Sequence, residues 1–196
     1  MTDAPAIDPA SSALLVMDYQ RSVVQMVDDA DALVARAASA IATARVAGIT
    51  VGYVRVAFDD QDYAAIPDTN KTFTALAASR RLHDTDPDTV IDARVAPEPG
   101  DIIVRKVRVG AFSTTDLDEQ LRAHGITTLI LAGISTSGVV LSTVRAAADM
   151  DYRVYLLEDA CADTDPVVHE TLTQRVYPRQ CYVISVADLP ALLPAA

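Results

Sequence analysis

Apolar segments of strand length alternate with longer amphipathic segments along most of this chain. The apolar segments read ALLVM, ITVGYVRVA, DIIVRKVRV, TLILAG, YRVYLLED and CYVISV. Between them, the segments 30–48, 115–125, 138–150 and 165–177 carry apolar residues at a spacing of three and four. Such a spacing is typical of amphipathic helices. The pattern therefore predicts β-strands joined by α-helices.

The strands are rich in β-branched residues and apolar on both faces, which is typical of a parallel sheet covered by helices on both sides. We therefore expect an α/β protein, a three-layer α/β/α sandwich with a mainly parallel central sheet. Residues 59–100 break the alternation, because they mix acids, prolines and one short helical pattern. Excursions of this length usually form lids or subunit contacts. Neither a repeat nor a second core is visible, so we expect a single domain over residues 1–196.

The composition limits which kinds of molecule we expect the protein to bind. Hydrophobic residues make up 51% of the 196 residues, enough for a continuous core without disulfides or metals. The formal charge of -11 repels polyanions, so we expect a small-molecule ligand, with no nucleic acid and no membrane partner. No apolar run reaches the ~20 residues of a membrane span, and the N-terminal stretch lacks the basic region of a secretory leader. Cys161 and Cys181 form no CxxC pair, which is typical of small buried residues in a reducing compartment. These features predict a cytoplasmic protein.

Three polar features follow predicted strands. Asp18 comes directly after ALLVM, Lys106 comes late in DIIVRKVRV, and the turn GISTSG follows TLILA. In doubly wound folds, ligands bind beyond the carboxyl ends of the strands. Taken alone, Asp18 is a turn former and Lys106 a side chain that reaches water. Taken together they can share one pocket, and we then expect their charged groups to lie within about 4 Å of each other.

The same segments resemble a known family. VMDYQ with Asp18 and Gln20, KVRVGAFSTTDL with Lys106, AGISTSGVVLSTVRAA, and LLEDACAD followed by HETL are similar in order and spacing to the signature segments of the isochorismatase-like, or cysteine hydrolase, superfamily. The resemblance spans nearly the whole chain. It implies a Rossmann-like three-layer fold, assembly as a homodimer or homotetramer, and a site made of an Asp base, a Lys and a Cys nucleophile at a helix N-terminus.

The nucleophile is where this chain departs from the family. The family pattern Gly-x-x-Thr-x-x-Cys-Val is matched at Gly133, Thr136 and Val140, so the Cys position is Val139. Valine has no nucleophilic atom, and the covalent thiol route cannot operate. We expect Val139 in the first turn of the following helix, facing the pocket. We also expect backbone N–H groups of the turn to point inward and form an anion site.

Two functional hypotheses remain open. True isochorismatases, which carry Gly in place of the Cys, hydrolyse a vinyl ether with the Asp as acid. By that resemblance, the first hypothesis is a small-molecule hydrolase with a non-thiol route, in which Asp18 is the acid/base and Lys106 assists. The alternative is a catalytically inactive small-molecule-binding or scaffolding pseudoenzyme of the same fold. A serine-based acyl hydrolase is a third possibility, although hydroxyls before a helix commonly cap it. The predicted substrate-binding residues are Gln20, Phe112, Ser135, Ser137 and Gly138.

No metal or cofactor motif is present in the sequence. His83, His124 and His169 are far apart and form no HxxxH or DxH spacing. No GxGxxG or GxxxxGKS motif occurs, so no nucleotide cofactor is indicated. We therefore predict neither a metal nor a cofactor.

Overall fold

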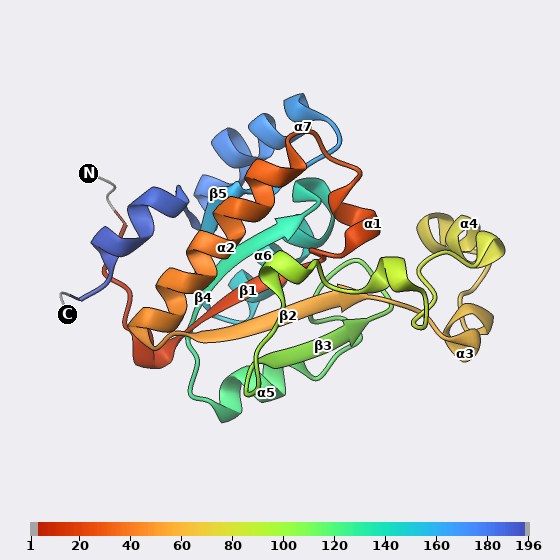
Figure 1. The fold of residues 1–196 in the computed structure, drawn as a ribbon, viewed down its shortest axis with the longest axis horizontal. Coiled ribbons are helices and arrows are strands. Elements are labelled where there is room, and N and C mark those ends of the chain that lie inside the picture. Colours follow the sequence, from red (N-terminus) through yellow and green to blue (C-terminus); the bar gives the residue numbers. More distant parts are fainter. Residues whose placement is uncertain (1–3, 195–196) are drawn as a thin grey trace.

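The apolar segments form one sheet of six parallel strands (Figure 1). The computed structural model describes residues 4–194, so residues 1–3 of the N-terminal stretch considered above lie outside it. The strand order is β3-β2-β1-β4-β5-β6. The strands are β1 Ser12–Met17, β2 Thr50–Val56, β3 Ile102–Lys106, β4 Thr128–Ile134, β5 Arg153–Ala162 and β6 Tyr182–Ile184.

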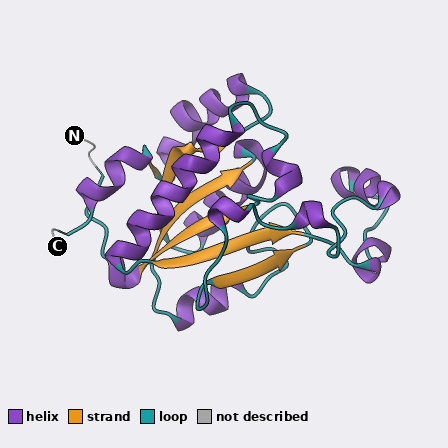
Figure 2. Cartoon of the chain, viewed as in Figure 1, coloured by secondary structure: helices purple, strands orange, loops and turns teal. Residues whose placement is uncertain are grey.

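Helices cover both faces of the sheet (Figure 2). The α-helices are α1 Arg21–Val24, α2 Ala30–Ala47, α3 Asp60–Ala64, α4 Lys71–Ser79, α5 Leu117–Ala123, α6 Leu141–Asp149 and α7 Pro166–Thr171. Short 3-10 helices lie at Pro9–Ser11, Pro87–Thr89, Ala93–Val95, Tyr177–Arg179 and Val186–Leu192, and wide π-helical turns at Thr136–Val140 and Leu172–Val176.

Side chains along each strand alternate between the two faces of the sheet, so the core lies in two layers, one on each face. Leu14 and Val16 of β1 pack in the cluster that holds the buried side of α2, whereas Leu15 and Met17 pack in the cluster that holds α5 and α6. Successive strand residues point to opposite faces, and both faces are apolar here because both are covered. The predicted three-layer sandwich is thereby confirmed.

The predicted segment 101–109 is longer than the strand it forms. Strand β3 ends at Lys106, which is paired in register with Val56, the last residue of β2. Beyond that pair the neighbouring strand offers no further ladder partner, so the chain turns away. This places Lys106 at the carboxyl edge of the sheet.

The excursion 59–100 extends beyond the carboxyl edge of the sheet and carries the short helices α3 and α4 (Figure 1). It has a small apolar cluster of its own, formed by Phe58, Tyr63 and Phe73 together with Val56 of β2. No helix among residues 4–194 is long and apolar enough to cross a bilayer.

Candidate active site

Strands β1 and β4 lie side by side at the centre of the sheet, where the strand order reverses direction. The chain moves outward from β1 through β2 to β3 and then returns to β4. In open parallel sheets, ligands bind beyond the carboxyl ends of the strands at such a switch point. Asp18 follows β1 there, and the GISTSG turn follows β4.

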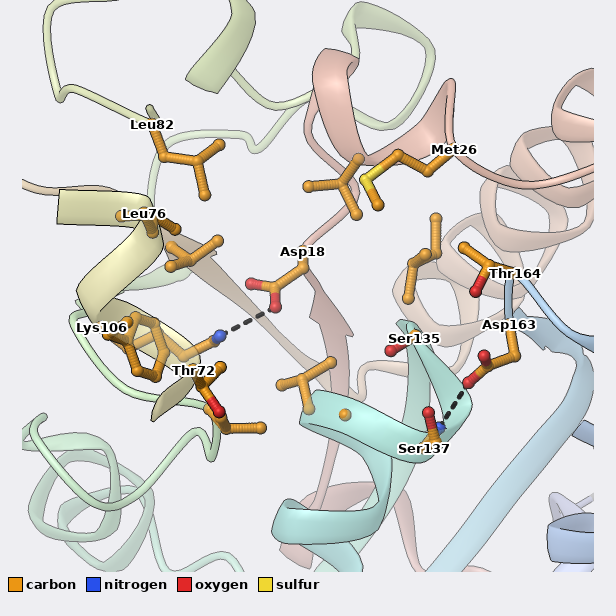
Figure 3. Close-up of a pocket in the computed structure, with 17 residues that line it drawn as sticks. Asp18, Met26, Thr72, Leu76, Leu82, Lys106, Ser135, Ser137, Asp163 and Thr164 are labelled. Atoms are coloured by element: carbon orange, nitrogen blue, oxygen red, sulfur yellow. Dashed lines mark hydrogen bonds and ion pairs between the residues drawn. The ribbon is translucent and has the colours of Figure 1, made fainter. Parts of the chain in front are cut away.

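Asp18 and Lys106 form a buried ion pair at this edge (Figure 3). The Lys106 Nζ lies 2.8 Å from Oδ2 of Asp18, although β2 separates their strands. The ammonium also donates to the carbonyl of Arg108 at 3.3 Å. The predicted proximity of the two charged groups is confirmed.

The second carboxylate oxygen of Asp18, Oδ1, is the atom of this pair that is available to a ligand. Burial raises the pKa of the Asp18 carboxyl, and the Lys106 ammonium only partly opposes this rise. Oδ1 is buried, and no group among residues 4–194 donates a hydrogen bond to it. A buried oxygen without a partner is costly, so this atom is suited to receive a proton or a hydrogen bond from a ligand.

Both residues face a cavity of about 380 Å³, within the range of small-molecule sites. Its walls are largely apolar. Met26 flanks it on one side, and Leu76 of α4 and Leu82, which follows α4, flank it on the other (Figure 3). Val23 and Phe73 also line it. The excursion 59–100 thus supplies one wall of the cavity.

The turn after β4 supplies the opposite wall. Its cavity-lining residues are Ser135, Ser137, Gly138 and Val139. Val139 is 2% exposed and lies in the wide turn that precedes α6, so it faces the pocket as predicted. A Cβ at Gly138 would lie 2.6 Å from the Oγ of Ser135, so a larger residue here requires that hydroxyl to move.

Two N–H groups of this turn already have acceptors within the protein, so the prediction that they form an anion site is wrong for these two. The N–H of Ser137 donates to Oδ2 of Asp163 at 2.7 Å (Figure 3). The N–H of Gly138 donates to the carbonyl of Ser135 at 3.1 Å. Because Gly138 has non-helical backbone angles, the turn folds back on itself instead of opening into a regular helix N-terminus. These donors therefore serve the protein's own acceptors.

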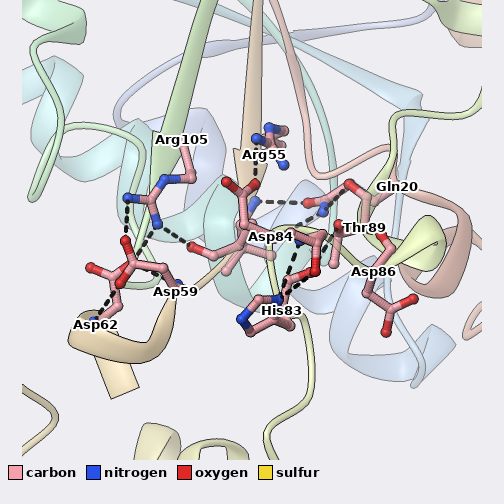
Figure 4. Close-up of polar contacts among 12 residues, drawn as sticks. Gln20, Arg55, Asp59, Asp62, His83, Asp84, Asp86, Thr89 and Arg105 are labelled. Carbon is pink, nitrogen blue, oxygen red and sulfur yellow. Dashed lines mark hydrogen bonds and ion pairs between the residues drawn. The ribbon is translucent and has the colours of Figure 1, made fainter. Parts of the chain in front are cut away.

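Gln20, predicted to bind substrate, does not line this cavity. Its side-chain amide donates to the carbonyls of Val56 and Thr89, at 2.9 and 2.7 Å, and accepts from the N–H of Val56 at 2.7 Å (Figure 4). These bonds tie the end of β2 to the excursion. Ion pairs Arg105–Asp62 and Arg55–Asp84 hold the same segment.

Phe112, also predicted to bind substrate, lies outside the Asp18 cavity. Its ring stacks on Tyr152 with centroids 6.1 Å apart, and it lines a neighbouring cavity. The sequence pattern places Phe112 near Lys106 in the chain, but the intervening residues turn it away from the carboxyl edge of β3.

Neither cysteine is placed to act as a nucleophile at this cavity. Cys161 and Cys181 are buried and do not line the cavity. Burial raises the pKa of the Cys161 thiol well above its ordinary range and that of Cys181 to about 12. At neutral pH both thiols stay protonated and unreactive.

Asp163 and His169 are site neighbours that the sequence interpretation did not single out. Asp163 follows β5, the strand beside β4, and an acid at that position is the signal by which it could have been found. His169 shares a hydrogen bond of 2.8 Å between its Nδ1 and the Thr136 hydroxyl, and burial lowers its pKa. Within residues 4–194, no three His, Cys, Asp or Glu side chains gather as a metal site would require.

Known proteins resemble this chain in sequence and in fold. A family model described as the isochorismatase domain matches residues 12–188. The ureidoacrylate amidohydrolase RutB of Methylobacterium radiotolerans is 33% identical over 184 residues, covering 82% of this chain and 70% of that protein. The uncharacterized isochorismatase family protein YecD of Escherichia coli O157:H7 is 32% identical over 190 residues, covering 93% and 96%.

Solved structures share the whole architecture. A cysteine hydrolase from Pseudomonas syringae pv. phaseolicola superposes with a TM-score of 0.86 at 24% identity, covering 97% of each chain, which bears on the fold alone. N-carbamoylsarcosine amidase from Thermoplasma acidophilum superposes with a TM-score of 0.73 at 26% identity, covering 90% of this chain and 96% of that one.

Proposed function

Because this chain belongs to the isochorismatase family of hydrolases, we propose that it hydrolyses a small molecule without a covalent thiol step. In this proposal Asp18 is the acid/base, Lys106 assists it, and water is the nucleophile. The observation that carries the proposal is the unpartnered Oδ1 of Asp18, buried at the base of an apolar cavity beside Lys106.

The charges around the cavity favour a reaction that starts with proton donation. A tetrahedral oxyanion needs donors such as turn N–H groups, and those of Ser137 and Gly138 are already engaged. Asp163 adds negative charge at the same turn, which favours a developing positive charge on the substrate. The raised pKa of Asp18 favours its protonated form relative to an exposed aspartate.

The proposed chemistry is acid-initiated cleavage of a C–O bond, as in a vinyl ether. Protonated Asp18 donates its proton to the terminal alkene carbon, and water adds to the resulting oxocarbenium carbon. The proton that water loses returns to the Asp18 carboxylate, and the hemiketal collapses to a ketone and an alcohol. Lys106 pairs with the Asp18 carboxylate between the two proton transfers and stabilises it.

A second candidate function is binding without turnover. The engaged N–H groups of Ser137 and Gly138 favour it, because they remove the donors that an acyl-transfer reaction would use. The Asp18–Lys106 pair would then serve as a fixed polar contact for a ligand. This alternative predicts ligand affinity with no product.

A substrate screen separates these functions. The panel contains vinyl ethers, esters, and amides that include ureidoacrylate and N-carbamoylsarcosine, the compounds in the relatives' names. We expect turnover of a vinyl ether, a loss of at least about 100-fold in Asp18→Asn, and retention in Asp118→Asn. Asp118 is a suitable control because it lies in α5 and pairs with Arg122, away from the cavity.

Two outcomes would contradict the proposed reaction. Equal activity in wild type and Asp18→Asn would remove Asp18 from the chemistry. Binding of a panel compound without product at every pH tested, on both the acidic and the alkaline side of neutrality, would support the binding function instead.

A further inference from the structure

A second cavity adjoins the first and differs from it in charge. It has a volume of about 470 Å³ and shares Thr72, Phe73 and Val109 with the Asp18 cavity. None of the side chains that line it is a carboxylate, in a chain with a formal charge of -11. Its further polar side chains are Asn70, Arg108, Ser113 and Ser142.

Arg108 is held in this cavity without an acidic partner. Its Nη1 donates to the carbonyl of Val107 at 2.6 Å, and its guanidinium carbon lies 5.7 Å from the centroid of the Phe73 ring. No ion pair within 4.0 Å joins Arg108 to a carboxylate among residues 4–194. The backbone and the ring thus fix the guanidinium in place, while its other N–H groups stay available.

Asn70 adds a second donor. Its Oδ1 accepts the N–H of Phe73 at 3.1 Å, where it caps α4, so its amide NH₂ is the part left for a ligand. The cavity therefore combines one cation with a neutral donor and lacks an acid. A single guanidinium balances one negative charge, which favours a carboxylate over a phosphate dianion.

The two cavities differ in the charge of their lining, so together they would orient a charged ligand. Asp18 and Asp163 face the end at the β4 turn, where Lys106 pairs with Asp18 and leaves Asp163 as the unbalanced charge, whereas Arg108 faces the other end. An anion is repelled at the first end and attracted at the second. Between the two ends, the Phe73 and Phe112 rings offer apolar and aromatic surface.

We propose that the second cavity is the recognition site for a carboxylate on the substrate, with Arg108 as the residue that determines this specificity. The substrate class is a small monocarboxylic acid with an apolar or aromatic body, whose neutral, hydrolysable end reaches Asp18. This assignment rests on the proposed hydrolysis for its orientation of the substrate.

Calorimetric binding of a matched acid and amide tests the site directly. The probes are 3-phenylpropanoate and 3-phenylpropanamide, measured at pH 7.5 and low salt. Wild type should bind the acid at least tenfold more tightly than the amide. Arg108→Met should abolish that preference and leave affinity for the amide unchanged, whereas Arg108→Lys should retain part of it.

Arg153→Met is the control of equal charge change, because Arg153 is exposed at the start of β5 and lines neither cavity. It should keep the full preference. Equal affinity for acid and amide in wild type, absence of binding for both probes, or an equal loss in Arg153→Met would each overturn the inference.

Asp18→Asn separates this inference from the proposed reaction. A carboxylate preference that depends on Arg108 and survives in Asp18→Asn, with no turnover of any panel compound, would refute the hydrolase and keep the recognition site. Turnover that depends on Asp18, with no acid preference through Arg108, would refute the recognition site and keep the hydrolase.

Discussion

Replacing Lys106 with methionine should cost about 3–5 kcal/mol of unfolding free energy at neutral pH, because it leaves a buried carboxylate without its counter-charge. The side chains of Lys106 and Asp18 are 3% and 7% exposed, so water cannot replace the lost ammonium. Methionine fills a similar volume, which keeps the cavity wall largely intact. The loss is therefore electrostatic in origin.

The loss should depend on pH in a defined direction. Burial raises the pKa of Asp18, so folding favours its protonated form, and its titration lowers stability as pH rises from the ordinary aspartate range to the raised value. In Lys106→Met the ammonium no longer lowers the pKa of Asp18, so the pH range over which stability falls extends to higher pH. The variant should therefore lose less stability, relative to wild type, at a pH of about 4.5 than at a pH of about 7.5.

Urea unfolding at the two pH values measures this effect. Lys71→Met is the matched control, because Lys71 is exposed at the start of α4, and it should change stability by less than about 0.5 kcal/mol. The double variant Asp18→Asn/Lys106→Met should recover most of the loss, because it buries no charge. A loss below about 1 kcal/mol in Lys106→Met, or one that is equal at both pH values, would refute the reasoning.

Two further predictions concern the turn after β4. Val139→Cys should cost less than about 1.5 kcal/mol of unfolding free energy, and its new thiol should react with iodoacetamide faster than Cys161 or Cys181, because the raised pKa values of those two keep them protonated. Mass spectrometry locates the alkylated cysteine, and a new thiol as inert as the two native ones would contradict the prediction. Gly138→Ala should cost about 1–3 kcal/mol in thermal or urea unfolding through the 2.6 Å approach to the Ser135 hydroxyl, and adding Ser135→Ala should restore part of it; no recovery would show that another contact is responsible.

The sequence sufficed for the fold and for the central pair of the site. The spacing of apolar residues predicts which segments are strands. Polar residues where a strand ends lie at the carboxyl edge of the sheet, so the sequence alone could predict that Asp18 and Lys106 lie close together. The Val139 position came instead from the resemblance to the family pattern, and the structure places Val139 in the turn after β4, where it lines the cavity.

Sequence could not supply the contacts that depend on distant partners. Gln20 follows Asp18 by two positions, yet backbone groups of Val56 and Thr89 satisfy its amide, and no local pattern reveals that. The inward-pointing N–H groups predicted for the turn failed at Ser137 for the same reason, since its acceptor, Asp163, follows the next strand of the sheet. The cavity wall formed by α4 is equally non-local.

The proposed direct attack by water is tested most directly by rapid-quench intact-protein mass spectrometry during turnover of the best substrate found in the screen. The account predicts product formation by wild type with the protein mass unchanged at every time point, and loss of product in Asp18→Asn. A transient covalent adduct on Ser135 or Ser137, or product formation that persists without the Asp18 carboxylate, would contradict it.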